Sequence, residues 1–246
     1  MAFDFKKEFK DLYVPKSKPA LIEVPAMTFV AVAGNGNPNE EEGAYKQALG
    51  LLYAFSYSVK MTKMGNWQPE GYFDYVVPPL EGLWWAGEGT FDGGTLVDKD
   101  KLSWISLIRQ PDFVTPVVFE KICEQITVKK PNLKNQIEQG DLKLVRFSEG
   151  LCAQVLHRGS YDDEASSVAK LSAFIDEQGY KTDIAEGGES PVGHRATKEF
   201  DPDAMLMALN VQGNVPALRL HHEIYLGDPR RTKPENLRTV IRHPIA

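Results

Sequence analysis

The two halves of this sequence follow the same order of segments, and this internal repeat constrains the fold more than any other feature. Gly36 aligns with Gly159 when the halves are displaced by 123 residues, which is half of the 246 in the chain. In each half a β-type segment comes first, a segment with helical periodicity follows, and further β-type segments come last. The repeat predicts two similar modules in one chain, and it excludes a solenoid of many short repeats.

The first module is expected over about residues 20–110. A strand, or two, is predicted over 20–32, followed by a turn rich in Asn and Gly and by a helix that Asn39 caps. The remaining predicted segments are a connection over 57–70, two strands over 71–86 interrupted at paired prolines, and a strand over 102–108.

The second module is expected over about residues 140–246, and a helix near 115–130 with Thr115 as its N-cap joins it to the first. The two modules together are interpreted as a single domain over 20–246. Residues 1–19 are polar and proline-containing, and they are predicted to form an extended arm. The second module's predicted segments are strands over 142–147 and 151–157, a helix from 162 to Gly179, a strand over 221–226 and a strand over 239–242.

The strand over 221–226 carries most of the chemistry. Because a strand sends alternate side chains to opposite faces, His221, Glu223 and Tyr225 should share one face. His222, Ile224 and Leu226 should share the other, which we expect to pack on a helix layer. We interpret the Glu223 face as the floor of a ligand cleft, since a carboxylate between an imidazole and a phenol does not belong in a core. The alternative is that Glu223 is a solvated residue on an open sheet face.

When the two halves are aligned with gaps, residues 72–77 match the Glu223 strand. Asp74 is then the counterpart of Glu223, so each module is expected to offer one carboxylate to a shared cleft. Aromatic residues are dense in the same region, and flat rings that stack on planar or cationic ligands contribute ~0.5–2 kcal/mol each where desolvated. At least half of these rings should be ordinary core residues. The candidate ligand-binding residues are Tyr57, Tyr72, Tyr75, Glu81, Trp84, Trp85, His221 and Tyr225.

Composition excludes several classes of function. The formal net charge is −6 and the basic residues are scattered, so we expect no nucleic-acid binding. Cys123 and Cys152 form no paired motif, which fits a reducing compartment and gives no zinc motif. His221 and His222 point to opposite faces and cannot chelate one ion together, so no metal site is expected. No cofactor loop, signal peptide or membrane span is apparent, and a cytoplasmic protein is predicted.

Three motifs resemble those of the GyrI-like small-molecule-binding proteins. They are 79–85 (PLEGLWW), 109–113 (RQPDF), and above all 221–226 (HHEIYL) followed by 234–242 (PENLRTVIR). The resemblance covers nearly the whole chain from about residue 20. It is closest to the stand-alone branch of the family, which lacks a helix-turn-helix segment before the ligand domain.

The resemblance implies an α+β fold of two strand-helix-strand-strand modules related by pseudo-twofold symmetry, with a curved antiparallel sheet. Helices are expected on one face of that sheet and the ligand cleft on the other. In the family the Glu of this strand lies at the centre of the pocket, which places Glu223 there. Some stand-alone members hydrolyse the cyclopropane ring of DNA-alkylating compounds. By that resemblance Glu223 would position or deprotonate water, and Trp84 with Tyr57 or Tyr75 would hold the ligand.

The sequence therefore favours a small-molecule-binding protein for planar hydrophobic or cationic compounds, with hydrolysis of cyclopropane-bearing genotoxins as a narrower hypothesis. The alternative is an interaction protein that modulates a partner such as DNA gyrase without catalysis. Strand alternation lets only one of Trp84 and Trp85 face the cleft, and the sequence does not decide which.

Overall fold

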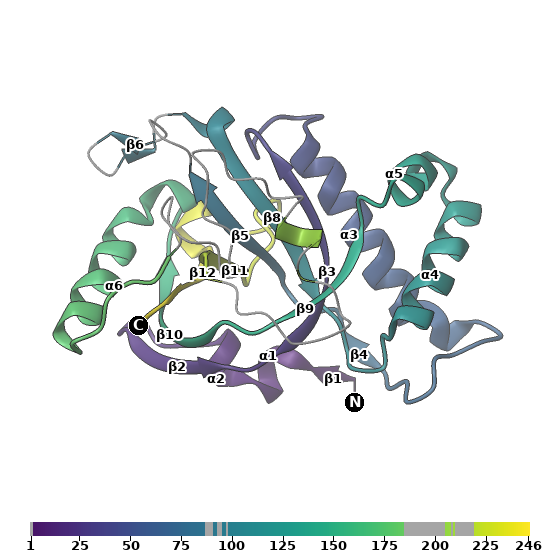
Figure 1. Cartoon of the computed structure of the whole chain (residues 1–246), viewed down its shortest axis with the longest axis horizontal. Helices are drawn as coiled ribbons and strands as arrows, with labels where there is room; N and C mark the ends of the chain where they lie inside the picture. The colour runs from purple at the N-terminus through teal and green to yellow at the C-terminus, as the bar shows by residue number, and fades with distance from the viewer. Residues whose placement is uncertain are drawn as a thin grey trace.

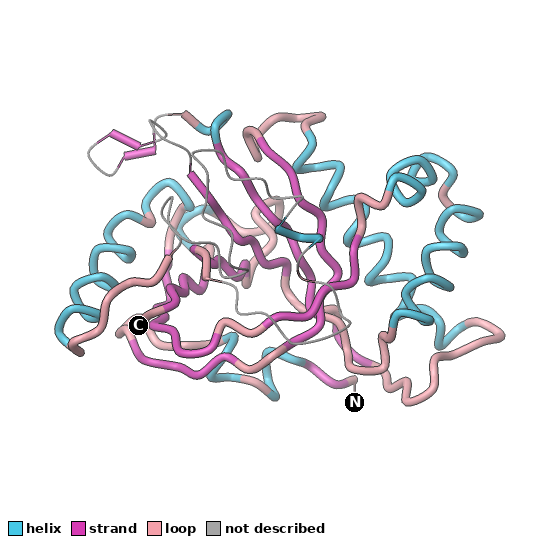
Figure 2. The backbone as a smooth tube through the Cα atoms, in the orientation of Figure 1, coloured by secondary structure: helices cyan, strands magenta, loops and turns pink. Residues whose placement is uncertain are grey.

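The computed structural model describes residues 2–86, 91–92, 95–96, 98–184, 205–207, 209 and 219–246. An antiparallel sheet of eight strands, in the order β2-β10-β12-β11-β5-β8-β3-β9, forms its centre (Figures 1 and 2). The strands are β2 (Ala20–Val24), β3 (Met27–Asn35), β5 (Leu80–Ala86), β8 (Leu102–Arg109), β9 (Lys143–Phe147), β10 (Gly150–Arg158), β11 (His221–Tyr225) and β12 (Arg238–Pro244).

The strand order is symmetric about the contact between β5 and β11, as the internal repeat predicts. The first module supplies β3, β5 and β8, and the second supplies β10, β11 and β12 in the same arrangement. β2 opens the first module but pairs with β10, and β9 opens the second module but pairs with β3. Each module thus contributes a strand beside the other, so both halves share one sheet. The predicted α+β class and its two-module organisation are confirmed.

The strand register corrects one detail of the predicted repeat. Val32 lies in a row with Gly82 across β8, and Val155 lies in a row with Glu223 across β12. Since Val32 and Val155 are equivalent in the repeat, the counterpart of Glu223 is Gly82. Asp74 is instead exposed and forms an ion pair with a lysine on the 61–64 turn, 3.0 Å away. The prediction of one carboxylate from each module is therefore wrong.

Most of the predicted helices are present. Thr115 caps α4 as expected, since its hydroxyl accepts a hydrogen bond from the Val118 amide. Asn39 does not cap α3, which begins at Ala44 after Gly43. The helices are α1 (Phe5–Glu8), α2 (Lys10–Tyr13), α3 (Ala44–Lys60), α4 (Pro116–Lys129), α5 (Lys134–Gln139) and α6 (Ala165–Glu177), and the short strands are β1 (Phe3–Asp4), β4 (Tyr75–Val76), β6 (Phe91–Asp92) and β7 (Thr95–Leu96).

The two long module helices lie on the same face of the sheet as Glu223. In α3, Tyr45 stacks on Trp84, and in α6, Leu171 packs against Ile241 beside Glu223 in the sheet. Figure 1 shows α3 and α6 far apart along the sheet, with α4 and α5 beyond α3. We expected helices and ligand site on opposite faces. In the structure both helices pack on the same face as Glu223, and Glu223 lies between them.

The N-terminal segment covers the opposite face of the sheet. Leu12 and Tyr13 are buried, and the guanidinium of Arg242 donates a hydrogen bond to the carbonyl of Leu12 at 2.8 Å. The predicted extended arm is therefore wrong, because apolar residues at its helical positions pack into the core. Within the described ranges no helix is both long and apolar enough to cross a membrane.

Candidate functional site

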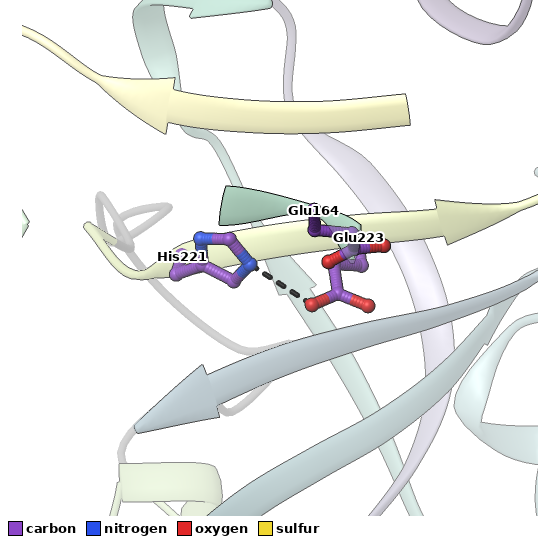
Figure 3. Close-up of side chains that lie close together, drawn as sticks. All are labelled: Glu164, His221 and Glu223. Carbon is purple, nitrogen blue, oxygen red and sulfur yellow. Dashed lines mark hydrogen bonds and ion pairs between the residues drawn. The ribbon is translucent and has the colours of Figure 1, made fainter. Parts of the chain in front are cut away.

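A chain of hydrogen bonds holds the Glu223 carboxylate at the centre of β11. The Nε2 atom of His221 lies 2.9 Å from Oε1 of Glu223 (Figure 3), and Nδ1 of His221 lies 2.8 Å from Nε2 of His243 on β12. The side chains of His221 and Glu223 remain 22% and 13% exposed, so solvent reaches both. These contacts fix the orientation of a carboxylate that is still accessible.

The second imidazole of this chain of contacts, His243, is uncharged near pH 7. Burial, and then the neighbouring His221, lower the pKa of His243 to about 3, so that its ring is neutral near pH 7. His221 bridges Glu223 and His243 through its two ring nitrogens. The two imidazoles thus connect the Glu223 carboxylate to β12.

Aromatic rings surround this carboxylate on the same face. Nε1 of Trp84 donates a hydrogen bond to the Tyr225 hydroxyl at 2.7 Å. Tyr45 stacks on Trp84 with ring centroids 5.6 Å apart, and the edge of Tyr161 meets Tyr225 at 5.5 Å. Gly82 makes this packing possible, because a Cβ there would lie 2.6 Å from Nε1 of Trp84. The result is a half-buried set of rings beside a charge.

The hydroxyl groups of these tyrosines stay protonated. Burial, followed by the Glu223 charge, raises the pKa of Tyr161 to about 12 and that of Tyr225 well above its ordinary value. Burial is also the main cause that raises the pKa of Tyr45. The phenols are therefore neutral hydrogen-bond donors and acceptors at physiological pH.

Four of the residues proposed from the sequence come together here. They are Trp84, His221, Glu223 and Tyr225, which share one face of neighbouring strands. The alternation of β5 settles the choice between the adjacent tryptophans, because Trp84 contacts Tyr225 while Trp85 projects from the other face.

The other proposed residues lie elsewhere. Tyr75 is fully buried in an aromatic cluster with Phe5 and Phe113, and Tyr72 joins that cluster at the edge of Phe113. Tyr57 projects from α3, with half of its surface exposed, and its ring lies 6.3 Å from that of Tyr53. Glu81 is buried on the face of the sheet opposite to Glu223. The structure thus places Tyr72 and Tyr75 in the core, as we expected for at least half of the rings.

Glu81 belongs to a second, buried cluster that the sequence did not reveal. Nδ1 of His222 lies 3.0 Å from Oε1 of Glu149, and its Nε2 lies 3.0 Å from Oε2 of Glu81. Arg242 donates to the other Glu149 oxygen at 2.9 Å. All four side chains are buried, so His222 does not form the purely apolar helix contact that we expected.

The charges of this cluster stabilise one another. Burial alone would lower the pKa of His222, but the carboxylates of Glu149 and Glu81 raise it to about 9. Burial would likewise raise the pKa of Glu149, whereas His222 and Arg242 lower it to about 2. Two cations therefore neutralise two anions in the interior.

Sequence reasoning missed Tyr45, Tyr161, Glu164 and His243 on the Glu223 face. His243 carries a weak signal, because it lies two residues beyond Ile241 on a strand and so shares a face with it. Tyr45 and Tyr161 come from the start of α3 and the turn before α6, and only the packing of those helices brings them to β11.

Comparison with known proteins places the chain in a family. The family model for the GyrI-like small molecule binding domain matches residues 17–189. A crystal structure of a hydrolase from Listeria innocua is 38% identical over 99% of this chain and 100% of that chain, with a TM-score of 0.76. An uncharacterized conserved protein from the same organism is 40% identical over 99% and 100%, with a TM-score of 0.77. None of the curated proteins matches. The chain thus belongs to the GyrI-like small-molecule-binding family.

Proposed function

We propose that the protein binds planar hydrophobic or cationic small molecules against the rings beside Glu223, and that it hydrolyses those that carry a strained cyclopropane ring. The single observation behind this proposal is the Glu223 carboxylate, which His221 orients beside Trp84 and Tyr225 while part of it stays open to solvent.

The binding part of the proposal rests on the chemistry of the rings. A flat ligand can stack on indole and phenol faces, and a cationic ligand gains further from the nearby carboxylate. Neutral tyrosine hydroxyls at Tyr161 and Tyr225 can hydrogen-bond to polar atoms of the ligand. These features select flat compounds with few polar groups and no excess negative charge.

The hydrolytic part of the proposal uses Glu223 as a general base. In that reaction Glu223 takes a proton from water as the water oxygen bonds to a cyclopropane carbon. The ring bond from that carbon to the carbon conjugated with the ligand's carbonyl breaks, and its electron pair moves into the carbonyl group, which then takes up a proton from solvent. Positioned general bases contribute about 10²–10⁴-fold to rate. The hydrolase from Listeria innocua that is 38% identical to this chain supports hydrolysis as the type of reaction.

The reaction is tested by mixing the protein with a panel of planar compounds that includes a cyclopropane-bearing alkylator. Tryptophan fluorescence reports binding, and mass spectrometry reports a product that is one water heavier. The expected result is that wild-type protein forms the product and Glu223→Gln does not, although Glu223→Gln still binds the compound. Glu235→Gln, an exposed carboxylate on the 234–236 turn, is the matched control and should turn over normally.

Recovery of every compound intact would contradict hydrolysis and leave a binding protein. Equal turnover by Glu223→Gln and wild type would remove Glu223 from the reaction. We further propose a cytoplasmic location, which the two buried and unpaired cysteines support because thiols stay reduced there.

A further inference from the structure

We infer that Glu164, His221 and Glu223 form a binding site for a divalent transition-metal ion of the Zn²⁺ class. Each residue offers one ligand atom, and these atoms all lie within 4.8 Å of one another (Figure 3). Glu164 precedes α6, while the other two residues are on β11. The site therefore depends on the docking of α6 against the sheet, and no sequence motif could have revealed it.

The donor set suits such an ion. Zinc in proteins is bound by imidazole nitrogen at about 2.0–2.1 Å and by carboxylate oxygen at about 2.0–2.2 Å. Two carboxylates also balance the charge of a divalent cation. The present spacing requires a small inward movement of the ligands, which the partly exposed side chains of His221 and Glu223 permit.

His243 supplies the supporting contact that metal-binding histidines usually have. A ligating imidazole normally hydrogen-bonds through its second nitrogen to a neighbour, which fixes the ring orientation. Here Nε2 of His221 faces the carboxylate, and Nδ1 is held by His243 at 2.8 Å. With the ion bound at Nε2, the proton of His221 would be carried on Nδ1 and donated to His243. The imidazole is thus oriented in advance for metal binding.

Three protein ligands leave a tetrahedral ion with one open position. Catalytic zinc sites keep this arrangement, whereas structural sites are closed by four protein ligands. Tyr161 and Tyr225 lie next to the cluster, and the charge of Glu223 contributes to the raised pKa of both hydroxyl groups. A water molecule or a polar ligand atom could therefore complete the coordination beside the rings. This inference goes beyond the proposed organic-ligand function and does not depend on it, and with an ion bound Glu223 would act as a metal ligand and not as the general base.

The site is tested by titrating tag-free, chelator-treated protein with Zn²⁺ in a calorimeter, and with Co²⁺ while visible absorption is recorded. We expect one equivalent of Zn²⁺ and the absorption of four-coordinate Co²⁺. Glu164→Gln and His221→Asn should abolish both signals, and His243→Phe should weaken binding by roughly tenfold. Asp163→Asn, an exposed neighbour of Glu164, is the matched control and should bind as wild type does.

Absence of a one-equivalent signal in the wild type would overturn the inference, as would unchanged binding by Glu164→Gln. Each variant's urea unfolding midpoint shows that it is folded, and His221→Asn provides a second ligand variant if Glu164→Gln does not fold. Tryptophan fluorescence with a planar compound is measured in parallel. Failure of Zn²⁺ to bind while the compound still binds would reject the metal site alone.

Discussion

The adjacent histidines of β11 occupy opposite environments. His222 is completely buried between Glu81 and Glu149, and Arg242 completes a neutral set of four charges. His221, one residue earlier, is 22% exposed and directs Nε2 toward Glu223. Histidine and glutamate therefore form a closed ionic cluster on one face of the sheet and a solvent-accessible hydrogen-bonded pair on the other.

The difference between the two faces distinguishes charged residues that stabilise the fold from a charged residue that can bind a ligand. In the buried cluster every charge has an opposite partner within hydrogen-bonding distance, so an added ligand would have nothing to neutralise. On the Glu223 face a carboxylate stays accessible beside aromatic rings, which a ligand can contact. We therefore expect substitutions in the buried cluster to change stability, and substitutions on the Glu223 face to change binding and turnover.

The largest expected effect is the loss of stability caused by Glu149→Gln. This substitution removes the carboxylate that faces both His222 and Arg242, and breaking a buried ion pair from one side costs about 3–5 kcal/mol. Urea denaturation measures the free energy of unfolding. The exposed Glu235→Gln should change it by no more than about 0.5 kcal/mol. Equal stability of the two variants would show that the cluster does not hold the sheet together.

The pH dependence of stability should sharpen the same contrast. The pKa of His222 is raised from 6.5 to about 9, so its contribution is fully present below about pH 6.5 and is lost as the pH rises to about 9. Unfolding free energies measured across this range should fall in the wild type. In His222→Gln the slope due to this residue should disappear. An unchanged slope would mean that His222 is not protonated in the folded protein.

A smaller effect should distinguish the adjacent tryptophans. Trp84→Ala removes a ring that contacts Tyr45 and Tyr225, and it should weaken binding of a planar compound by about 1–3 kcal/mol. Trp85→Ala is the control on the opposite face and should leave the affinity of the folded protein unchanged. Fluorescence anisotropy of a dye ligand measures both variants. Equal losses would contradict the assignment of the two faces.

The smallest effect is expected for Gly82→Ala. Its new Cβ would lie 2.6 Å from Nε1 of Trp84 and 2.9 Å from the Tyr225 hydroxyl, so the two rings must shift. We expect ligand affinity to fall by about 1 kcal/mol through this overpacking. Gly50→Ala, in open space on α3, is the matched control and should bind normally. Normal binding by Gly82→Ala would show that the ring contact is not needed.

The sequence predicted the parts of this molecule that depend on periodicity within one segment. Alternation along 221–226 placed His221, Glu223 and Tyr225 on one face, and the repeat predicted two modules in one chain. Alternation does not say which layer covers a face, which is why the position of the helices relative to Glu223 was wrong. Asp74 was misassigned because its segment was matched by eye to β11, whereas the register matches Gly82.

The buried cluster could not be predicted, for a different reason. Glu149, His222 and Arg242 are separated by tens of residues, and each alone resembles an ordinary polar residue. Only strand pairing brings Arg242 opposite His222, and only the turn before β10 brings Glu149 to both. Because the opposite charges of this cluster lie on different segments, no single segment carries a sequence pattern that would predict it.

The most direct test of the account compares product formation and unfolding free energy in Glu223→Gln and Glu149→Gln, with both proteins assayed at equal folded concentration. The account predicts that Glu223→Gln keeps wild-type stability and loses hydrolysis of the cyclopropane-bearing compound, while Glu149→Gln loses stability and its folded fraction still forms the product. Hydrolysis that survives in Glu223→Gln but disappears in folded Glu149→Gln would contradict the account, because the functional carboxylate would then belong to the buried cluster.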